Sequence, residues 1–253
     1  MKKQNLDLQD KLDEKEKIGG RAYSNGVRLM SNSYTAKAFY TREGQLKVKA
    51  NKLKKQESFS IIKKIPIIRG IVSLFFAVLM FLKEGVNNPK KYWIIFLIIL
   101  LELIYWLLPS STADGFLDIV LILYIAIPLI LLLRFRKTIV EILKFHGAEH
   151  KTVHYYENDC SGDIKSYSRL HRRCGSNIVF YYLLISLVSI FLFNKNNFFL
   201  EILYLGIAYE AIRYTPEKLL FLPYFFQRIV TKEPDEKHIR AAKNALDVLI
   251  DRS

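Results

Sequence analysis

The sequence is poor in cysteine. Its 253 residues include only Cys160 and Cys174, and no C-x-x-C pair occurs. Structural zinc knuckles are built from such pairs, so we do not expect one. The first residues, Met1–Lys17, are charged and lack the apolar core of a signal peptide, so no cleaved leader is expected. The sequence also lacks internal repeats and low-complexity tracts.

Acidic residues are also few relative to basic ones. The chain has 24 Asp and Glu against 38 Lys and Arg, which gives a formal net charge of +14. A basic excess can indicate a nucleic-acid partner, but here the basic residues adjoin long apolar runs. We therefore expect anionic lipid headgroups as partners and no nucleic acid.

Apolar residues are abundant, at 51% of the chain, and they are gathered in runs. A helix needs about 20 apolar residues, with a lower limit of about 17, to cross the core of a bilayer. The runs that approach this length are Tyr92–Leu108, Phe116–Leu133, Ile178–Phe193 and Phe198–Tyr209. They predict a mainly α, polytopic α-helical membrane protein with about four spanning helices.

The distribution of Lys and Arg predicts the topology. Residues 109–115 contain neither, whereas residues 134–176 contain nine. By the positive-inside rule the first segment faces outward, the second faces the cytoplasm, and both termini are cytoplasmic. Pro66–Leu82 has lysines beyond both ends, so we predict an interfacial or re-entrant helix there. The alternative is a fifth span with an external N-terminus.

Two elements are predicted outside the apolar runs. Alternating residues on either side of Glu43-Gly44 predict a small N-terminal cytoplasmic β-hairpin over 34–50, preceded by a glycine-punctuated turn region at Gly19–Gly26. After Pro234, apolar residues at helical spacing predict an amphipathic helix over Asp235–Arg252; they are Ile239, Ala242, Leu246 and Leu249.

These elements divide the chain into six predicted segments. They are a charged tail (1–18), a turn and hairpin region (19–63), an interfacial helix with two spans (64–133), a basic cytoplasmic segment (134–176), two further spans (177–214) and a cytoplasmic C-terminal helix (215–253).

The stretch Phe145–Lys151 places His146, Glu149 and His150 in H-x-x-E-H spacing. In a helix Glu149 falls at about 300° and His150 at about 40° from His146, so all three share one face. Two imidazoles one turn apart can bind a metal, and the carboxylate between them can act as the base for a metal-bound water. The same spacing is the inverzincin signature. The alternative is a polar helix start at the membrane surface.

The same helical face extends further if the helix continues. His154 and Glu157 then join the stripe. The predicted ligands of a zinc ion are His146 and His150 with Glu157 or, as second choice, Glu210 as the third; His171 and Cys174 are further candidates. Glu210 is a candidate because an ionisable group in a spanning helix is expensive to bury unpaired. Its alternative is a pair with Arg213.

Arg169–Gly175 is a second polar block, just before an apolar run. One interpretation is that its arginines have no role beyond orienting the chain in the membrane. Alternatively, Arg169 and Arg173 bind an anion, because guanidinium groups match phosphate oxygens bidentately. Cys174 can also be considered as a nucleophile with a lowered pKa.

Several motifs follow one another in a fixed order: Gly19–Ala22 with Gly26-Val27, Pro66–Gly70, His146–Lys151, Arg169–Gly175, Tyr209–Arg213 and Thr231–Asp235. In this order they resemble the bacterial YqhQ-like membrane family, a group of unknown function. The chain departs from the family pattern at Arg21 and Asn25, which stand where the pattern has Gln and Glu. The resemblance implies a multi-pass protein of the bacterial cell membrane and implies no activity.

Two functions from different classes fit these observations. The first is a regulator or scaffold whose basic cytoplasmic surface binds anionic lipid or a protein partner. The second is a membrane-embedded, zinc-dependent hydrolase in which His146 and His150 bind the metal and Glu149 is the base. We expect the first, and the second is the alternative that makes the sharper prediction.

Overall fold

The computed structural model describes residues 16–53, 65–89, 92–93, 96, 99–100, 126–193 and 197–252. These residues are mainly helical with a small N-terminal antiparallel sheet, which confirms the predicted class at this level. Most of the expected span Tyr92–Leu108 and the first part of Phe116–Leu133 lie outside the described residues, as does most of the predicted tail 1–18.

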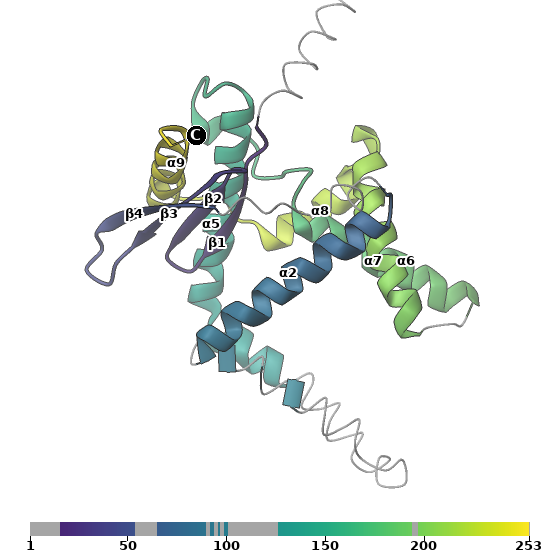
Figure 1. The fold of residues 1–253 in the computed structure, drawn as a ribbon. Helices are drawn as coiled ribbons and strands as arrows, with labels where there is room; N and C mark the ends of the chain where they lie inside the picture. Colours follow the sequence, from purple (N-terminus) through teal and green to yellow (C-terminus); the bar gives the residue numbers. More distant parts are fainter. Residues whose placement is uncertain are drawn as a thin grey trace, which may run out of the picture.

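The sheet is a four-stranded meander in the order β1-β2-β3-β4 (Figure 1). Its strands are β1 Gly19–Tyr23, β2 Gly26–Met30, β3 Tyr34–Tyr40 and β4 Leu46–Lys52. The predicted hairpin is confirmed as β3–β4, with Gly44 in the left-handed region at φ 78°. The prediction of a turn region over residues 19–26 is wrong, because only Ser24 and Asn25 turn between β1 and β2.

One face of the sheet packs on two helices, α5 (Arg136–Glu157) and α9 (Glu236–Ile250) (Figure 1). α9 begins after Pro234 with a capping box between Asp235 and His238. The predicted apolar stripe on this helix is confirmed, because Ile239, Ala242, Leu246 and Leu249 are all buried. Full burial of one such leucine contributes about 1.5–3 kcal/mol. The sheet, α5 and α9 therefore share one hydrophobic core.

Apolar helices make up the rest of the described molecule. They are α2 (Ile68–Asn87), α6 (Gly175–Phe193), α7 (Phe198–Tyr214) and α8 (Phe221–Val230). α7 packs on both α2 and α6, and α8 packs on α6. Among the described residues, α2 and α6 are long and apolar enough to cross a membrane. Large apolar side chains point outward here, with Phe191 86% exposed.

α2 is one continuous helix of 20 residues, so it does not have the broken form of a re-entrant segment. It crosses α7 at two glycines. A Cβ added at Gly70 would lie 2.7 Å from the Cβ of Tyr209, and one added at Gly206 would lie 2.6 Å from Cγ2 of Ile67. Small residues let apolar helices approach closely. The choice between an interfacial and a spanning α2 stays a prediction.

Candidate functional site

α5 continues through Glu157, as the stripe of histidines and glutamates requires. Its buried side, with Phe145 1% exposed, packs into the core against the ring of His238 at a centroid distance of 4.5 Å. Gly147 is needed where the chain after α8 passes over the helix, because an added Cβ would lie 2.1 Å from the carbonyl oxygen of Lys232. α5 is thus fixed from both sides.

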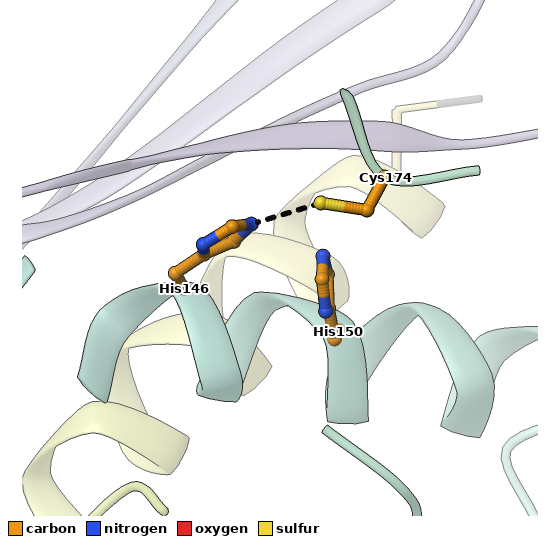
Figure 2. A group of neighbouring side chains, drawn as sticks. All are labelled: His146, His150 and Cys174. Carbon is orange, nitrogen blue, oxygen red and sulfur yellow. Dashed lines mark hydrogen bonds between the residues drawn. The ribbon is translucent and has the colours of Figure 1, made fainter. Parts of the chain in front are cut away.

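His146, His150 and Cys174 form a compact group beside α5. Figure 2 shows both imidazoles rising from the helix toward the thiol, which lies in the turn just before α6. The Cys174 Sγ atom is 3.4 Å from Nε2 of His146, and one ligand atom from each residue lies within 4.8 Å of the others. Zinc–nitrogen bonds of about 2.0–2.1 Å and zinc–sulfur bonds of about 2.3 Å are compatible with this spacing.

Backbone carbonyls orient both imidazole rings. His146 donates from Nδ1 to the carbonyl of Val230 at 2.9 Å, and His150 donates from Nδ1 to the carbonyl of Arg169 at 2.6 Å. A carbonyl can only accept, so each Nδ1 carries the proton and each neutral ring keeps a lone pair on Nε2. This is the arrangement by which metal-binding histidines are usually held.

The electrostatics of the metal-free group favour a thiolate. Burial opposes ionisation of Cys174, but hydrogen bonding and charge from His146 and His150 outweigh it and lower the pKa of the thiol to about 4. Burial likewise opposes protonation of His146, and Cys174 outweighs it and raises the pKa of His146 to about 9. A cation at this place would therefore find a thiolate and could displace the imidazolium proton.

Glu149 lies beside this group and is 7% exposed. Burial raises the pKa of its carboxyl group, which the charges of His150 and His146 oppose. Within the described residues its carboxyl group makes no hydrogen bond, and β1 passes directly over it at Gly20, where an added Cβ would lie 2.7 Å from Cγ of Glu149. The glutamate and the three candidate ligands line a cavity of about 500 Å³.

A second polar group follows, in which His154 and Glu157 of α5 meet His171 from the segment before α6. His171 lies 3.2 Å from Glu157 through Nε2 and accepts from the backbone N–H of Arg173 at 3.1 Å through Nδ1. His154 donates from Nε2 to the carbonyl of Leu170 at 2.9 Å. Hydrogen bonding to His171 outweighs burial and lowers the pKa of Glu157, so the carboxylate is charged. The nitrogens of His171 are thus both used within the protein.

The structure brings together three of the predicted site residues, His146, Glu149 and His150, and it places Cys174 beside them in place of Glu157 or Glu210. Glu157 belongs to the second group and is bound by His171 and Arg173. Glu210 pairs with Arg69 of α2, whose Nε lies 2.7 Å from Oε1, because the α2–α7 crossing brings these residues together. Cys174, the lesser candidate from the sequence, lies in the place predicted for them.

The arginines of Arg169–Gly175 mostly contact the protein itself. Arg169 donates to carbonyl oxygens at the end of α8, those of Arg228 and Thr231. Arg172 donates to three carbonyls around the end of α7. Arg173 lines the cavity but contacts Glu157 and the carbonyl of Ile18. Each guanidinium of this block already donates to protein oxygens through one terminal nitrogen, so an anion would have to use the remaining donors, and the anion clamp stays a prediction.

The sequence motifs meet in space. Arg69-Gly70 contacts Tyr209 and Glu210 at the α2–α7 crossing. Three other blocks meet at the cavity, where Gly20 packs on Glu149 and Cys174 faces His146. Outside the cavity lining, Lys151 forms a 2.7 Å ion pair with Glu233 of the last block. Spacing along the chain could not show these contacts, because they join residues distant in sequence.

Comparison with known proteins confirms the resemblance to the YqhQ-like family. The family described as "Protein of unknown function (DUF1385)" matches residues 26–252. The chain is 22% identical to the "Uncharacterized protein YqhQ" of Bacillus subtilis (strain 168), over 92% of each chain. No solved structure matches it. Because the family match covers most of its length, the chain belongs to the DUF1385 family.

Proposed function

We propose that this protein is a membrane-associated, metal-dependent hydrolase. The observation that carries the proposal is the convergence of two carbonyl-anchored imidazoles and one thiol on a cavity that also contains Glu149. Mixed nitrogen and sulfur ligands favour zinc among the common biological cations. Three protein ligands leave a fourth coordination position for water or substrate, as catalytic zinc sites do.

Each residue has a distinct role in this proposal. His146, His150 and Cys174 would hold the ion, which would supply acidification of a water molecule. Glu149 would act as the general base and return the proton to the leaving group, which a buried carboxyl group with a raised pKa is suited to do. His171 and Glu157 support the turn that carries Cys174.

A membrane location is part of the proposal. α2 and α6 satisfy the length and composition of spanning helices, and Cys174 lies one residue before α6. We propose about four spans, with the cavity and both termini on the cytoplasmic side of a bacterial cell membrane. The candidate active site then lies at the membrane surface, where both soluble and membrane-bound substrates can reach it.

The basic side of the sheet supports anionic lipid as a partner. One cation from each strand stands in a row across the sheet, in the register Arg21, Arg28, Lys37 and Lys49. Like charges directly opposite each other are destabilising, and an external anion would add to the attraction that Glu84 already gives Arg21. Each basic group near an anionic leaflet contributes about 1 kcal/mol of attraction. A scaffold that only bound lipid through this row would not need the oriented imidazoles of α5.

Metal analysis of the detergent-purified protein tests the hydrolase proposal. We expect about one zinc ion per chain in the wild type and in Glu149→Gln, and little in His146→Ala. A Glu149→Gln protein that keeps zinc shows that the glutamate is not a ligand. Metal-free wild-type protein that also fails to take up added zinc would overturn the proposal and leave the thiolate of Cys174 as the reactive group.

The lipid partner has a separate test. Native mass spectrometry of the full chain should show preferential retention of phosphatidylglycerol over phosphatidylcholine. The double variant Lys37→Glu, Lys49→Glu should lose this preference, whereas Arg240→Glu, an exposed charge change on α9, should keep it. Equal retention in both variants would contradict a role for the cation row.

A further inference from the structure

The cavity has a wall made of strand backbone. β1 is an edge strand, paired only with β2, and residues Ile18–Ala22 of β1 and its approach line the cavity. Arg173 contacts the carbonyl of Ile18 at 3.3 Å, and Gly20 packs on Glu149. The strand therefore runs along the face of α5 that carries the candidate ligands.

The register shows which backbone groups face the cavity side. The two-residue turn at Ser24-Asn25 makes Tyr23 and Gly26 a hydrogen-bonded pair. Hydrogen-bonded and non-bonded pairs alternate in an antiparallel ladder, so Gly20 and Ala22 direct their N–H and C=O groups away from β2. The contact from Arg173 to the carbonyl of Ile18, two residues before Gly20, follows the same alternation. Among the described residues, nothing pairs with the free edge at Gly20 and Ala22.

The two arginines that line the cavity each pair with a carboxylate. Arg21 forms a 2.9 Å ion pair with Glu84 of α2, and Arg173 is bound by Glu157. A phosphate would have to compete with these carboxylates for the arginines. The unpaired groups are instead main-chain donors and acceptors, repeating every second residue, which only another extended chain can match.

We propose that an extended peptide pairs with the free edge of β1 as a fifth strand and is cleaved over the candidate metal centre. This inference rests on the proposed hydrolase function and names its substrate class. A cavity of about 500 Å³ lies within the usual range of ligand sites, about 300–1,000 Å³. The contact at Gly20 places the added strand beside Glu149, so main-chain pairing would hold an amide carbonyl close to the base.

The reaction is amide hydrolysis. The water oxygen bonds to the amide carbon as the C–N bond breaks. Glu149 transfers one water proton to the departing nitrogen, which leaves a carboxylic acid and an amine. Gly20 keeps a side chain out of the space between the strand and α5, where an added Cβ would lie 2.7 Å from Cγ of Glu149.

A matched pair of proline variants tests the pairing. Ala22→Pro removes a donor from the free edge of β1 without removing a ladder bond from the sheet. Ala50→Pro makes the same change on β4, whose N–H at this position also faces a free edge, on the far side of the sheet. The full-length, zinc-loaded proteins are incubated with unfolded β-casein, and the products are identified by mass spectrometry.

We expect the wild type and Ala50→Pro to cleave casein equally and Ala22→Pro to lose at least about tenfold in kcat/KM with unchanged zinc content. If Ala22→Pro does not fold, the wild-type protein is instead given two isomeric substrate peptides. Each peptide is N-methylated at every second backbone nitrogen, and the two differ in which set of nitrogens is methylated. Only one of them presents its free N–H groups to β1, and only that one should be cleaved.

The failures are distinguishable. Absence of zinc binding overturns the proposed function itself. A zinc-loaded wild type that leaves casein intact overturns the peptide inference, and if it hydrolyses phosphatidylglycerol vesicles the hydrolase proposal stands with a lipid substrate. Equal cleavage by Ala22→Pro and Ala50→Pro, or of both methylated peptides, overturns pairing with β1.

Discussion

The two histidine-containing groups between α5 and the segment before α6 have similar compositions and differ in how their ring nitrogens are used. His146 and His150 each anchor Nδ1 on a carbonyl and turn Nε2 toward Cys174. In the second group, His171 uses both nitrogens in hydrogen bonds, one of them with a charged carboxylate. The first arrangement leaves lone pairs converging on one point, and the second leaves His171 none to offer. The comparison teaches that residue type and spacing alone do not identify a metal site.

Replacing one histidine from each group should give the largest contrast. His150→Ala removes a candidate ligand and should lower zinc affinity by more than about 100-fold. Loss of a residue that only hydrogen-bonds to a ligand typically lowers metal affinity by about 10–100-fold. His154→Ala, one turn along the same helix, removes a hydrogen bond to Leu170 and a 3.9 Å contact with Glu157 and should keep zinc. Competition with a chromophoric chelator measures both affinities. Equal losses would mean that the two groups act as one site.

Unfolding experiments should separate the groups in a second way. A ligand present at about 1,000 times its Kd stabilises the folded state by about 4 kcal/mol, so a chelator should lower the Tm of the wild type. Cys174→Ala should have a Tm that the chelator does not change. His171→Ala should be destabilised by about 1–3 kcal/mol, because buried partners lose their hydrogen bonds, yet it should still respond to the chelator. A His171→Ala protein with no chelator response would contradict the division.

Periodicity accounts for the parts of this structure that the sequence could predict. The β3–β4 hairpin, the buried stripe of α9 and the shared face of His146, Glu149 and His150 all follow from short, regular spacing. What spacing could not reveal depends on contacts between distant residues. Cys174 meets His146 across 28 positions, and Arg69 meets Glu210 across 141.

The missed strand β1 has a different cause. Glycines in a strand interior weaken it, so Gly19-Gly20 favoured a turn. The structure shows the compensating reason at Gly20, where the strand backbone lies against Glu149 and no side chain would fit. The low intrinsic preference of glycine for strands therefore gave the wrong prediction here. Glycine occupies position 20 because the strand backbone packs closely on Glu149 of the candidate site.

Substitutions of the neighbouring glycines Gly19 and Gly20 test how tightly β1 packs against Glu149, beside His146, His150 and Cys174. Gly20→Ala would bring a Cβ within 2.7 Å of the Glu149 side chain, whereas at Gly19 an added Cβ meets nothing within 4 Å. We expect Gly20→Ala to cost about 1–3 kcal/mol of unfolding free energy and Gly19→Ala to be nearly neutral. Denaturant titration measures both. Two equal values would show that β1 does not press on the glutamate.

The pH dependence of Cys174 alkylation should show whether His146 and His150 stabilise its thiolate in metal-free protein. Because the pKa of its thiol is lowered to about 4, it is already a thiolate across the neutral range, so its reactivity should not rise as pH rises. In a Cys160→Ser background, the rate of alkylation by iodoacetamide should change less than about twofold between about pH 6 and 8, whereas a thiol of ordinary pKa, about 8.5, would gain severalfold or more. Added zinc should block the reaction. A rate that climbs steeply with pH would show that the imidazoles do not hold the thiolate.

The smallest effect is expected at Arg172, which belongs to neither group. One of its nitrogens, Nη2, makes all three contacts with the carbonyls of Ile212, Arg213 and Thr215, at 3.3, 2.8 and 2.5 Å. A lysine ammonium has three donors and can satisfy the same acceptors from one point. Arg172→Lys should therefore stay within about 0.5 kcal/mol of the wild type, with zinc content unchanged. Arg172→Ala leaves these carbonyls without their donor and should cost about 1–3 kcal/mol. If Arg172→Lys lowers the free energy of unfolding as much as Arg172→Ala does, the planar guanidinium group of Arg172 is required. The arginine block would then do more than connect the start of α6 to the end of α7.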